Sequence, residues 1–283
     1  MTTPTIRTRR VKFDYSPGHV DRHFAQGDLV LSHVVAMLSA VFPEGEDFFV
    51  RSVRHYADDI TDPELKKAVA GFTGQETMHG NEHRALNQRL QELGYPTRRV
   101  DRMTKADLAR AHRRLDPKIQ LAITAALEHY TATLAEVLLT DERARELLGE
   151  GDVRSILLWH ALEESEHKAV AFDVYRAVGG TEKMRIRTMR TVTVSFLVGM
   201  TFQTIISLLG DRATYNPKTL VKSLAKLRHS PWLSKEVRHR ITDYNRKGFH
   251  PNDNDNSELL AYWTKELFGP GGRLEGNLKG AAA

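Results

Sequence analysis

The segment Trp159-His160-Ala161-Leu162-Glu163-Glu164-Ser165-Glu166-His167-Lys168 decides the fold that we expect for this chain. Within it, Glu164 and His167 stand three residues apart, which puts a carboxylate and an imidazole on one face of a helix. Such a pair facing inward needs a metal ion or a proton partner, because an unpaired buried charge is strongly unfavourable. Glu76 and His79 repeat the spacing upstream. A fold that brings the two pairs together would therefore create a metal site.

The composition is that of a soluble globular protein. Of the 283 residues, 41% are hydrophobic and 27% are charged, which argues against a disordered chain and leaves enough length for a core. The absence of cysteine excludes disulfides, thiolate metal sites and cysteine catalysis. The basic stretch 1–13 is not followed by the apolar segment of a signal peptide, so we expect a cytoplasmic location.

Four segments carry inward-facing residues spaced four and three apart, which is the pattern of bundle helices. We therefore expect an all-α fold built on a four-helix bundle with crossing angles of about 20°. Each of these rows of inward-facing residues forms a stripe along its helix and has acids or imidazoles near its middle. These are Glu46, then Glu76 and His79, then Glu128, then Glu164 and His167. Helical phase favours Glu46 over Glu44, because Glu46 continues the stripe of its helix.

Local signals set the limits of these helices. Asp62-Pro63 and Asp116-Pro117 each combine an N-cap with a proline suited to the first helical position. Glycine-containing turns end the second, third and fourth helices, the last of which is expected to run unbroken from about residue 152 to 178. Pro43 predicts a kink or short break in the first helix. The polar segment 95–115 is expected to be a connector with room for a short helix.

The polar groups on the four stripes predict a dinuclear metal site. Four carboxylates balance the charge of two divalent cations, and two imidazoles complete the set. Oxygen-rich ligation suits iron or manganese better than copper, and zinc sites prefer fewer ligands. A single Glu-x-x-His is more often a surface pair, but two of them, each matched to a single-Glu stripe, favour a site.

Other polar residues near the site receive weaker assignments. His83 and His160 lie one helical turn from the predicted ligands, and each is either an additional ligand or a hydrogen-bond partner that orients one. Glu163 and Glu166 lie off the stripe and are interpreted as a solvated edge or as groups that orient ligands. His129 is interpreted as a packing or surface residue.

The chain divides into an N-terminal arm at 1–25, the di-metal bundle at 26–180 and a basic helical extension at 181–283 packed on the bundle. Residues 181–250 hold fourteen Lys and Arg against four Asp and Glu. The uncharged run 191–210 is long enough to cross a bilayer, but its Ser, Thr and Gln favour a buried fifth helix. A lipid-facing helix and a true membrane span are the alternatives.

Several motifs together resemble a bacterial family of predicted metal-dependent hydrolases, and they are spread over about two-thirds of the chain. These motifs are Phe42-Pro43-Glu44-Gly45-Glu46-Asp47-Phe48-Phe49, Gln75-Glu76-Thr77-Met78-His79 with His83, Glu128-His129, the opening segment, Ala171-Phe172-Asp173 and Gly248-Phe249-His250-Pro251. The Glu and His set also resembles that of ferritin-like di-iron proteins. This second resemblance implies a ferritin-like fold in which Glu76 and Glu164 bridge the metals and Glu46 and Glu128 are terminal ligands.

The leading hypothesis is an oxidase or oxygenase that uses O2 to oxidise an organic, hydrophobic and lipid-like substrate. Its centre would be Fe/Fe or Mn/Fe, with Glu46, Glu76, Glu128 and Glu164 as catalytic ligands, Tyr56 and Phe72 lining the substrate pocket, and an electron donor as partner. The alternative is a dinuclear hydrolase that uses a metal-bound hydroxide, and the second alternative is a non-enzymatic iron-binding protein.

The basic segment 181–250 indicates which partners the chain is expected to contact outside the metal site. The basic flank at 181–250 favours contact with a membrane surface or an acyl-carrier type partner over nucleic acid, because no nucleic-acid motif accompanies it. A solvated basic face is the simplest interpretation of the same residues. A homodimer is a further expectation.

Overall fold

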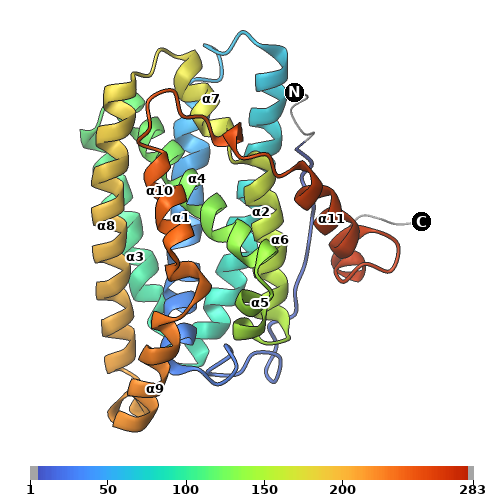
Figure 1. Cartoon of the computed structure of the whole chain (residues 1–283), viewed down its shortest axis with the longest axis vertical. Coiled ribbons are helices and arrows are strands. Elements are labelled where there is room, and N and C mark those ends of the chain that lie inside the picture. The colour runs from blue at the N-terminus through green and yellow to red at the C-terminus, as the bar shows by residue number, and fades with distance from the viewer. Residues whose placement is uncertain (1–5, 280–283) are drawn as a thin grey trace.

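The computed structural model describes residues 6–279, and the all-α class is confirmed for them (Figure 1). The pairing of extended segments found in this part of the chain is one isolated bridge between Val11 and Leu278. The α-helices are α1 (Leu29–Arg54), α2 (Pro63–Glu92), α3 (Thr97–Arg114), α4 (Pro117–Thr140), α5 (Glu142–Leu148), α6 (Asp152–His167), α7 (Val170–Ala177), α8 (Glu182–Leu209), α9 (Pro217–Arg228), α10 (Lys235–Asp243) and α11 (Ser257–Phe268).

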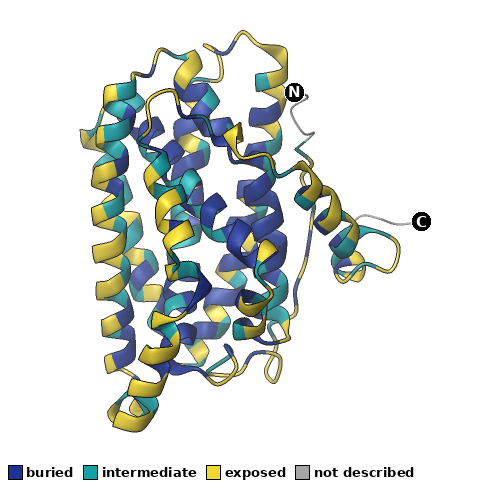
Figure 2. Ribbon diagram, viewed as in Figure 1, coloured by how far each residue is buried: buried dark blue, intermediate teal, exposed yellow. Residues whose placement is uncertain are grey.

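The central helices α1, α2, α4 and α6 surround the core. α1 packs along α2, α4 packs along α6, and α2 also contacts α6 and α7. Buried residues concentrate on these helices, as Figure 2 shows in dark blue. Fully burying a side chain such as Leu86 or Leu90 stabilises the fold by about 1.5–3 kcal/mol. The four segments that carry the predicted ligands therefore meet where burial is deepest.

Both predicted Asp-Pro helix starts are confirmed. Asp62 accepts a hydrogen bond from the Glu64 amide at the start of α2, and Asp116 accepts one from the Lys118 amide at the start of α4. The prolines that follow occupy positions where no intrahelical donor is needed. These caps fix where α2 and α4 begin, and hence how far along each helix its glutamate lies.

Of the two features predicted at Pro43, the short break was wrong, because α1 continues through this residue; the kink stays a prediction. A proline inside a helix removes the donor for the carbonyl four residues earlier, here that of Ser39. The Asn87 side chain on α2 donates to this carbonyl at 2.9 Å, and the Ser39 hydroxyl donates to the Asn87 side-chain oxygen at 2.8 Å. Packing between α1 and α2 thus replaces the lost bond and keeps Glu46 in the helix.

Three other helix limits differ from expectation. The third predicted helix ends at Thr140 instead of at the glycines of 149–151, and the separate helix α5 precedes those glycines. The segment 95–115 is largely one helix, α3, which packs along α1. The fourth predicted helix is divided, because α6 ends at His167 and α7 begins at Val170. Between them, the Lys168 ammonium donates to the carbonyl of Asn254 at 2.7 Å and lies 3.5 Å from the Glu136 carboxylate. The spacing of residues within the segment cannot predict these tertiary contacts, and so it does not predict the break.

The expectation that 191–210 is a buried fifth helix was wrong. α8 packs on α1 and α4 along one side, but only 22% of its most apolar 18-residue window is buried. Val192 and Ser207 face the packed side, whereas Val194 and Val198 are exposed. The packed side of α8 also buries Met189 and Leu208, but several of its other large apolar side chains lie on the outward side. The division into arm, bundle and extension stays a prediction.

Candidate metal centre

The structure brings all six predicted ligands to one place in the core. Glu46 comes from α1, Glu76 and His79 from α2, Glu128 from α4, and Glu164 and His167 from α6. Each of the six residues is at most 3% exposed. Their ligand atoms form overlapping groups, each within 4.8 Å: Glu76 with Glu128 and His167, Glu76 with His79 and Glu164, and Glu46 with His79 and His160. Shared members join these groups into one buried centre.

Most of the ligand atoms at this centre form no well-aligned hydrogen bond in the described part of the chain, although some lie close to one another. These atoms are both carboxylate oxygens of Glu46, Glu76 and Glu128, Oε2 of Glu164, Nδ1 of His79 and Nε2 of His167. Buried polar atoms are almost always paired, and leaving this many unpaired would be strongly unfavourable. The centre therefore has the chemistry of a site that cations complete.

The distances between these atoms suit metal coordination. Nε2 of His167 lies 3.0 Å from Oε1 of Glu76 and 3.3 Å from Oε2 of Glu128, and Nδ1 of His79 lies 3.8 Å from Oε1 of Glu164. Two ligand atoms about 2.1 Å from one ion lie about 3.0 Å apart at a right angle and farther apart at wider angles. The residues present thus fit a dinuclear centre of oxygen and nitrogen ligands.

Crowding of acids perturbs the carboxylates in the absence of cations. Burial, together with the charges of Glu128 and Glu164, raises the pKa of Glu76 to about 8. Burial and the charge of Glu164 raise the pKa of Glu128 to about 7. Burial lowers the pKa of His167, but the charges of Glu128 and Glu164 outweigh it and raise that pKa well above its usual range. Divalent ions would supply the positive charge that these groups otherwise take from protons.

Each histidine of the two pairs is oriented by a side chain behind it. Nε2 of His79 is 3.0 Å from Oε2 of Glu163, so its unpartnered Nδ1 faces the centre. Nδ1 of His167 is 2.9 Å from Oε1 of Gln75, which leaves Nε2 facing the centre. A fixed hydrogen bond to the far nitrogen sets the tautomer that can bind a metal.

The orienting side chains are tied to the N-terminal arm. Arg9 forms ion pairs with Glu163 at 3.0 Å and with Glu166 at 2.6 Å. Gln75 donates to Glu166 at 2.7 Å. Of the two interpretations of Glu163 and Glu166, the orienting one agrees with these contacts, and Glu163 is fully buried. Sequence reasoning missed Arg9 and Gln75; the only signal for Gln75 is its position next to Glu76.

His160 and His83 differ in their relation to the centre. Nε2 of His160 lies 2.9 Å from Oε1 of Glu164 and 3.8 Å from Oε1 of Glu46, and its ring stacks on His79. His83 lies behind it, with Nε2 2.8 Å from Nδ1 of His160. The contacts therefore make His83 a hydrogen-bond partner of His160, whereas His160 borders the centre itself.

Aromatic rings cover the two ligand histidines. Phe72 meets the His167 ring edge-on at 5.0 Å, and Trp159 meets the His79 ring edge-on at 4.9 Å. Tyr56 belongs to the same hydrophobic cluster as Phe72 but is only half-buried. His129 contacts the Arg240 carbonyl and His250 contacts Asp173, both away from the six predicted ligands.

A second group with metal-type side chains behaves differently. His23 and His33 approach Oδ2 of Asp211 at 2.9 and 3.2 Å, and Arg22 donates to the same oxygen at 3.0 Å. The carboxylate is thus already neutralised by a guanidinium. This contrast singles out the central Glu and His group as the candidate metal centre.

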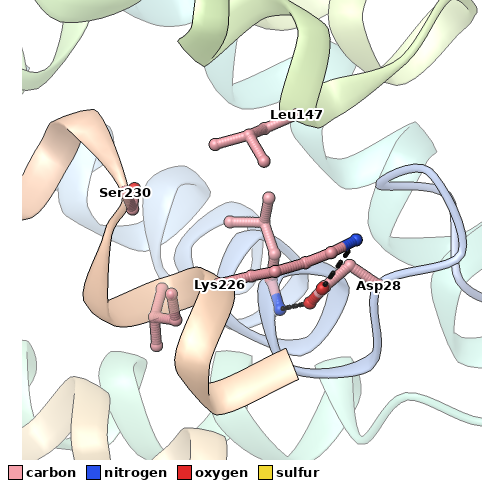
Figure 3. Close-up of a pocket in the computed structure, with 6 residues that line it drawn as sticks. Asp28, Leu147, Lys226 and Ser230 are labelled. Atoms are coloured by element: carbon pink, nitrogen blue, oxygen red, sulfur yellow. Dashed lines mark hydrogen bonds and ion pairs between the residues drawn. The ribbon is translucent and has the colours of Figure 1, made fainter. Parts of the chain in front are cut away.

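Two pockets lie near the start of α1, at the other end of this helix from Glu46. Figure 3 shows the smaller one, between Asp28, Leu147, Lys226 and Ser230. Asp28 precedes Glu46 by eighteen residues, which is about 27 Å along a helix at 1.5 Å per residue. An ion pair between Lys226 and Asp28, at 3.8 Å, crosses this pocket. It is therefore not a substrate pocket of the metal centre.

A protein-family model matches residues 7–255, and its description is "predicted metal-dependent hydrolase". No curated protein and no solved structure matches the chain. The matched range holds all six predicted ligands as well as Arg9 and Gln75, so it covers the centre together with the groups that orient it. The resemblance to the predicted metal-dependent hydrolases that the motifs indicated is therefore confirmed.

Proposed function

The chain belongs to the family of predicted metal-dependent hydrolases, and on this premise we propose that it is a dinuclear metal-dependent hydrolase. The observation that supports the proposal most strongly is the convergence of unpartnered carboxylate and imidazole atoms from four helices. When bound, two divalent ions would lower the pKa of a water molecule and polarise a carbonyl or phosphoryl oxygen of the substrate.

We assign the residues of the centre by their groupings. Glu46 and His79 would hold one ion, with His160 beside them, and Glu128 and His167 would hold the other. Glu76 and Glu164 would serve both ions. Glu76 shares one ligand-atom group with each of the two histidines, and Oε1 of Glu164 lies 3.8 Å from Nδ1 of His79 and 3.5 Å from Nε2 of His167. Their placement supports the bridging role that the ferritin-like resemblance implies.

The chain's own side chains would contribute position and proton control. Glu163 and Gln75 accept hydrogen bonds from the far nitrogens of His79 and His167, and so hold the near nitrogens toward the centre, where a cation could replace a proton. Phe72 and Trp159 exclude water from the histidine faces. Arg9 balances the charge of Glu163, which keeps that acid available as an acceptor.

The helix arrangement supports a ferritin-like four-helix bundle. In this proposal α1, α2, α4 and the divided α6–α7 are the four members, and α3 is the crossing connector. The contacts between α1 and α2, between α4 and α6, and between α2 and both α6 and α7 support it. Each member with a predicted ligand pair then faces a member with a single glutamate.

Oxygen activation is the second candidate. The comparisons do not favour it, but four carboxylates with two imidazoles are a ligand set that suits iron or manganese. An oxygenase would contain Fe/Fe or Mn/Fe and need an electron donor. Non-enzymatic iron binding stays a prediction.

Metal analysis combined with turnover tests the proposal. Full-length protein is loaded with Mn²⁺, Fe²⁺ or Zn²⁺ and assayed on aryl esters and phosphodiesters, with and without O2. We expect two ions per chain and hydrolysis that is the same under anaerobic conditions. Turnover that consumes O2, together with no hydrolysis of either substrate class, would replace the proposal with the second candidate.

The matched control is a buried glutamate outside the centre. Glu128→Gln should reduce the metal content, whereas Glu136→Gln on the same helix should leave it at two ions per chain. Glu136 is as deeply buried as Glu128, but it contacts Lys168 and Arg240. The pair therefore separates loss of a ligand from loss of any buried acid.

A further inference from the structure

The outward face of α8 is a continuous apolar stripe. Its exposed large apolar side chains are Val194, Leu197, Val198, Phe202, Ile205 and Leu209, each 50–64% exposed. These positions recur every three or four residues, so they share one side of the helix. α8 runs along one edge of the molecule (Figure 1), and its outer turns are exposed in Figure 2. Solvent-exposed apolar surface of this extent marks a contact with a partner.

Positive charge borders the stripe at both ends. Arg187 and Arg190 occupy the turns just before it on the same side of α8, and both are exposed. After the helix come exposed Arg212 and the exposed face of α9, where Lys218 and Arg228 flank Val221 and Leu224. Between residues 183 and 228 the chain holds nine Lys and Arg and one acid, Asp211, which is buried.

This charge distribution disfavours a second copy of the chain as the partner. Two α8 helices packed face to face would bring Arg187 and Arg190 against the same residues, or against the basic end at Arg212, in either direction. Like charges repel in both arrangements. An anionic surface, in contrast, attracts both ends while the apolar stripe enters a hydrophobic layer.

The geometry also argues for lying on a bilayer rather than crossing it. The opposite side of α8 packs on α1 and α4, so lipid cannot surround the helix. The exposed stripe from Val194 to Leu209 spans about 22 Å at 1.5 Å per residue, which is shorter than the ~30 Å hydrocarbon core. Tyr215 is 68% exposed just beyond it, and tyrosine favours the membrane–water boundary.

We propose that the outward face of α8, extended by α9, docks the protein onto the surface of an anionic lipid bilayer. Phe202 and its apolar neighbours enter the boundary between head groups and acyl chains, while Arg187, Arg190, Arg212 and Lys218 contact the lipid phosphates. The proposal is independent of the reaction at the metal centre, because it rests on surface residues alone.

Vesicle flotation of the full-length protein tests this surface. The probes are vesicles of phosphatidylcholine alone and vesicles with equal parts phosphatidylcholine and phosphatidylglycerol, at 0.05 and 0.15 M salt. We expect binding to the anionic vesicles, weaker at the higher salt, and at least about tenfold weaker binding to phosphatidylcholine alone. Leu197→Ser with Phe202→Ser, and separately Arg187→Glu with Arg190→Glu, should each weaken binding at least about tenfold.

Matched controls use residues away from the α8 and α9 face. Tyr262→Ser removes an exposed apolar residue on α11, and Lys235→Glu with Arg238→Glu reverses two exposed charges on α10; both should bind vesicles like the parent. The chain has no cysteine, so Val198→Cys and Tyr262→Cys each give one site for an environment-sensitive dye. Vesicles should shift the emission of the dye at position 198 only, a readout that does not require the disruptive variants to fold.

Three results would overturn the proposal. The parent protein could fail to float with anionic vesicles at 0.05 M salt, or the dye at position 198 could show no shift. Alternatively, gel filtration could show a dimer that Leu197→Ser with Phe202→Ser converts to a monomer, which would make a second copy the partner.

Discussion

The metal centre and α8 both invert the usual distribution of polar and apolar residues. At the centre, four carboxylates and two imidazoles lie in the deepest part of the core. On α8, large apolar side chains point outward. Neither arrangement is favourable for an isolated chain. The comparison leads to our two proposals, in which something outside the polypeptide would complete each region: cations at the centre and lipid at α8.

Removal of a shared ligand should have the largest effect. Glu76→Ala takes away a residue that belongs to two of the three ligand-atom groups at the centre. Metal content should fall below one ion per chain, and hydrolysis should fall by more than ~100-fold, because even loss of an orienting partner typically lowers activity 10–100-fold. Elemental analysis and initial rates measure both. Unchanged metal content would contradict the claim that cations complete the buried centre.

Metal-free protein should lose stability as the pH rises. The folded pKa values of Glu76 and Glu128, about 8 and about 7, lie above the ordinary 4.5 of the unfolded chain. Both states are protonated below pH 4.5, so these acids have no effect there, and the destabilisation grows between about pH 4.5 and 8 as the unfolded chain releases protons first.

Thermal melts of chelator-treated and reloaded protein check this prediction. The melting temperature of the metal-free protein should be lower at pH 8 than at pH 6. Metal-free Glu128→Gln lacks one of the two acids, so its smaller difference between these pH values serves as the reference. The melting temperature of the protein reloaded with metal should not fall in this way between pH 6 and pH 8. Identical pH profiles with and without metal would contradict it.

The groups behind the histidines should have an intermediate effect. Glu163→Gln removes the charged acceptor at Nε2 of His79 while keeping its shape. Metal affinity should weaken about 10–100-fold, as measured by competition with a chelator. The control is Glu150→Gln, an exposed acid near the start of α6, which should leave affinity at the parent value.

Surface substitutions on α8 should change stability least. Leu197→Ser with Phe202→Ser should alter the free energy of unfolding by less than about 0.5 kcal/mol per residue, since both side chains are half-exposed. Val192→Ser, on the packed side of the same helix, should destabilise by about 1–3 kcal/mol. Urea unfolding compares them. Equal losses from both variants would show that the outward stripe is part of the core.

The six central residues could be found from sequence because helical phase is a local property. Glu164 and His167 lie three apart on one stripe, and the stripe itself reports which side is buried. The same logic failed where the deciding contact is distant. Asn87 repairs α1 at Pro43, and Lys168 contacts Asn254 at the break after α6. The hydrophobic periodicity around Pro43 or Lys168 gives no information about these distant contacts.

The orienting network was hidden for the same reason. Arg9 reaches Glu163 and Glu166 from more than 150 positions away, and an arm without periodicity gives no indication of where it packs. The burial of α8 was misjudged for a different cause. Its composition suits a core helix, but only one of its sides packs, on α1 and α4, and the sequence does not contain that information.

Anomalous scattering from crystals of the metal-loaded protein tests the central claim most directly. The predicted result is two peaks inside the core, each within ligand distance of Glu76 or Glu164, one nearer His79 and the other nearer His167. A single peak at His23, His33 and Asp211, or no peak among the central residues, would contradict it.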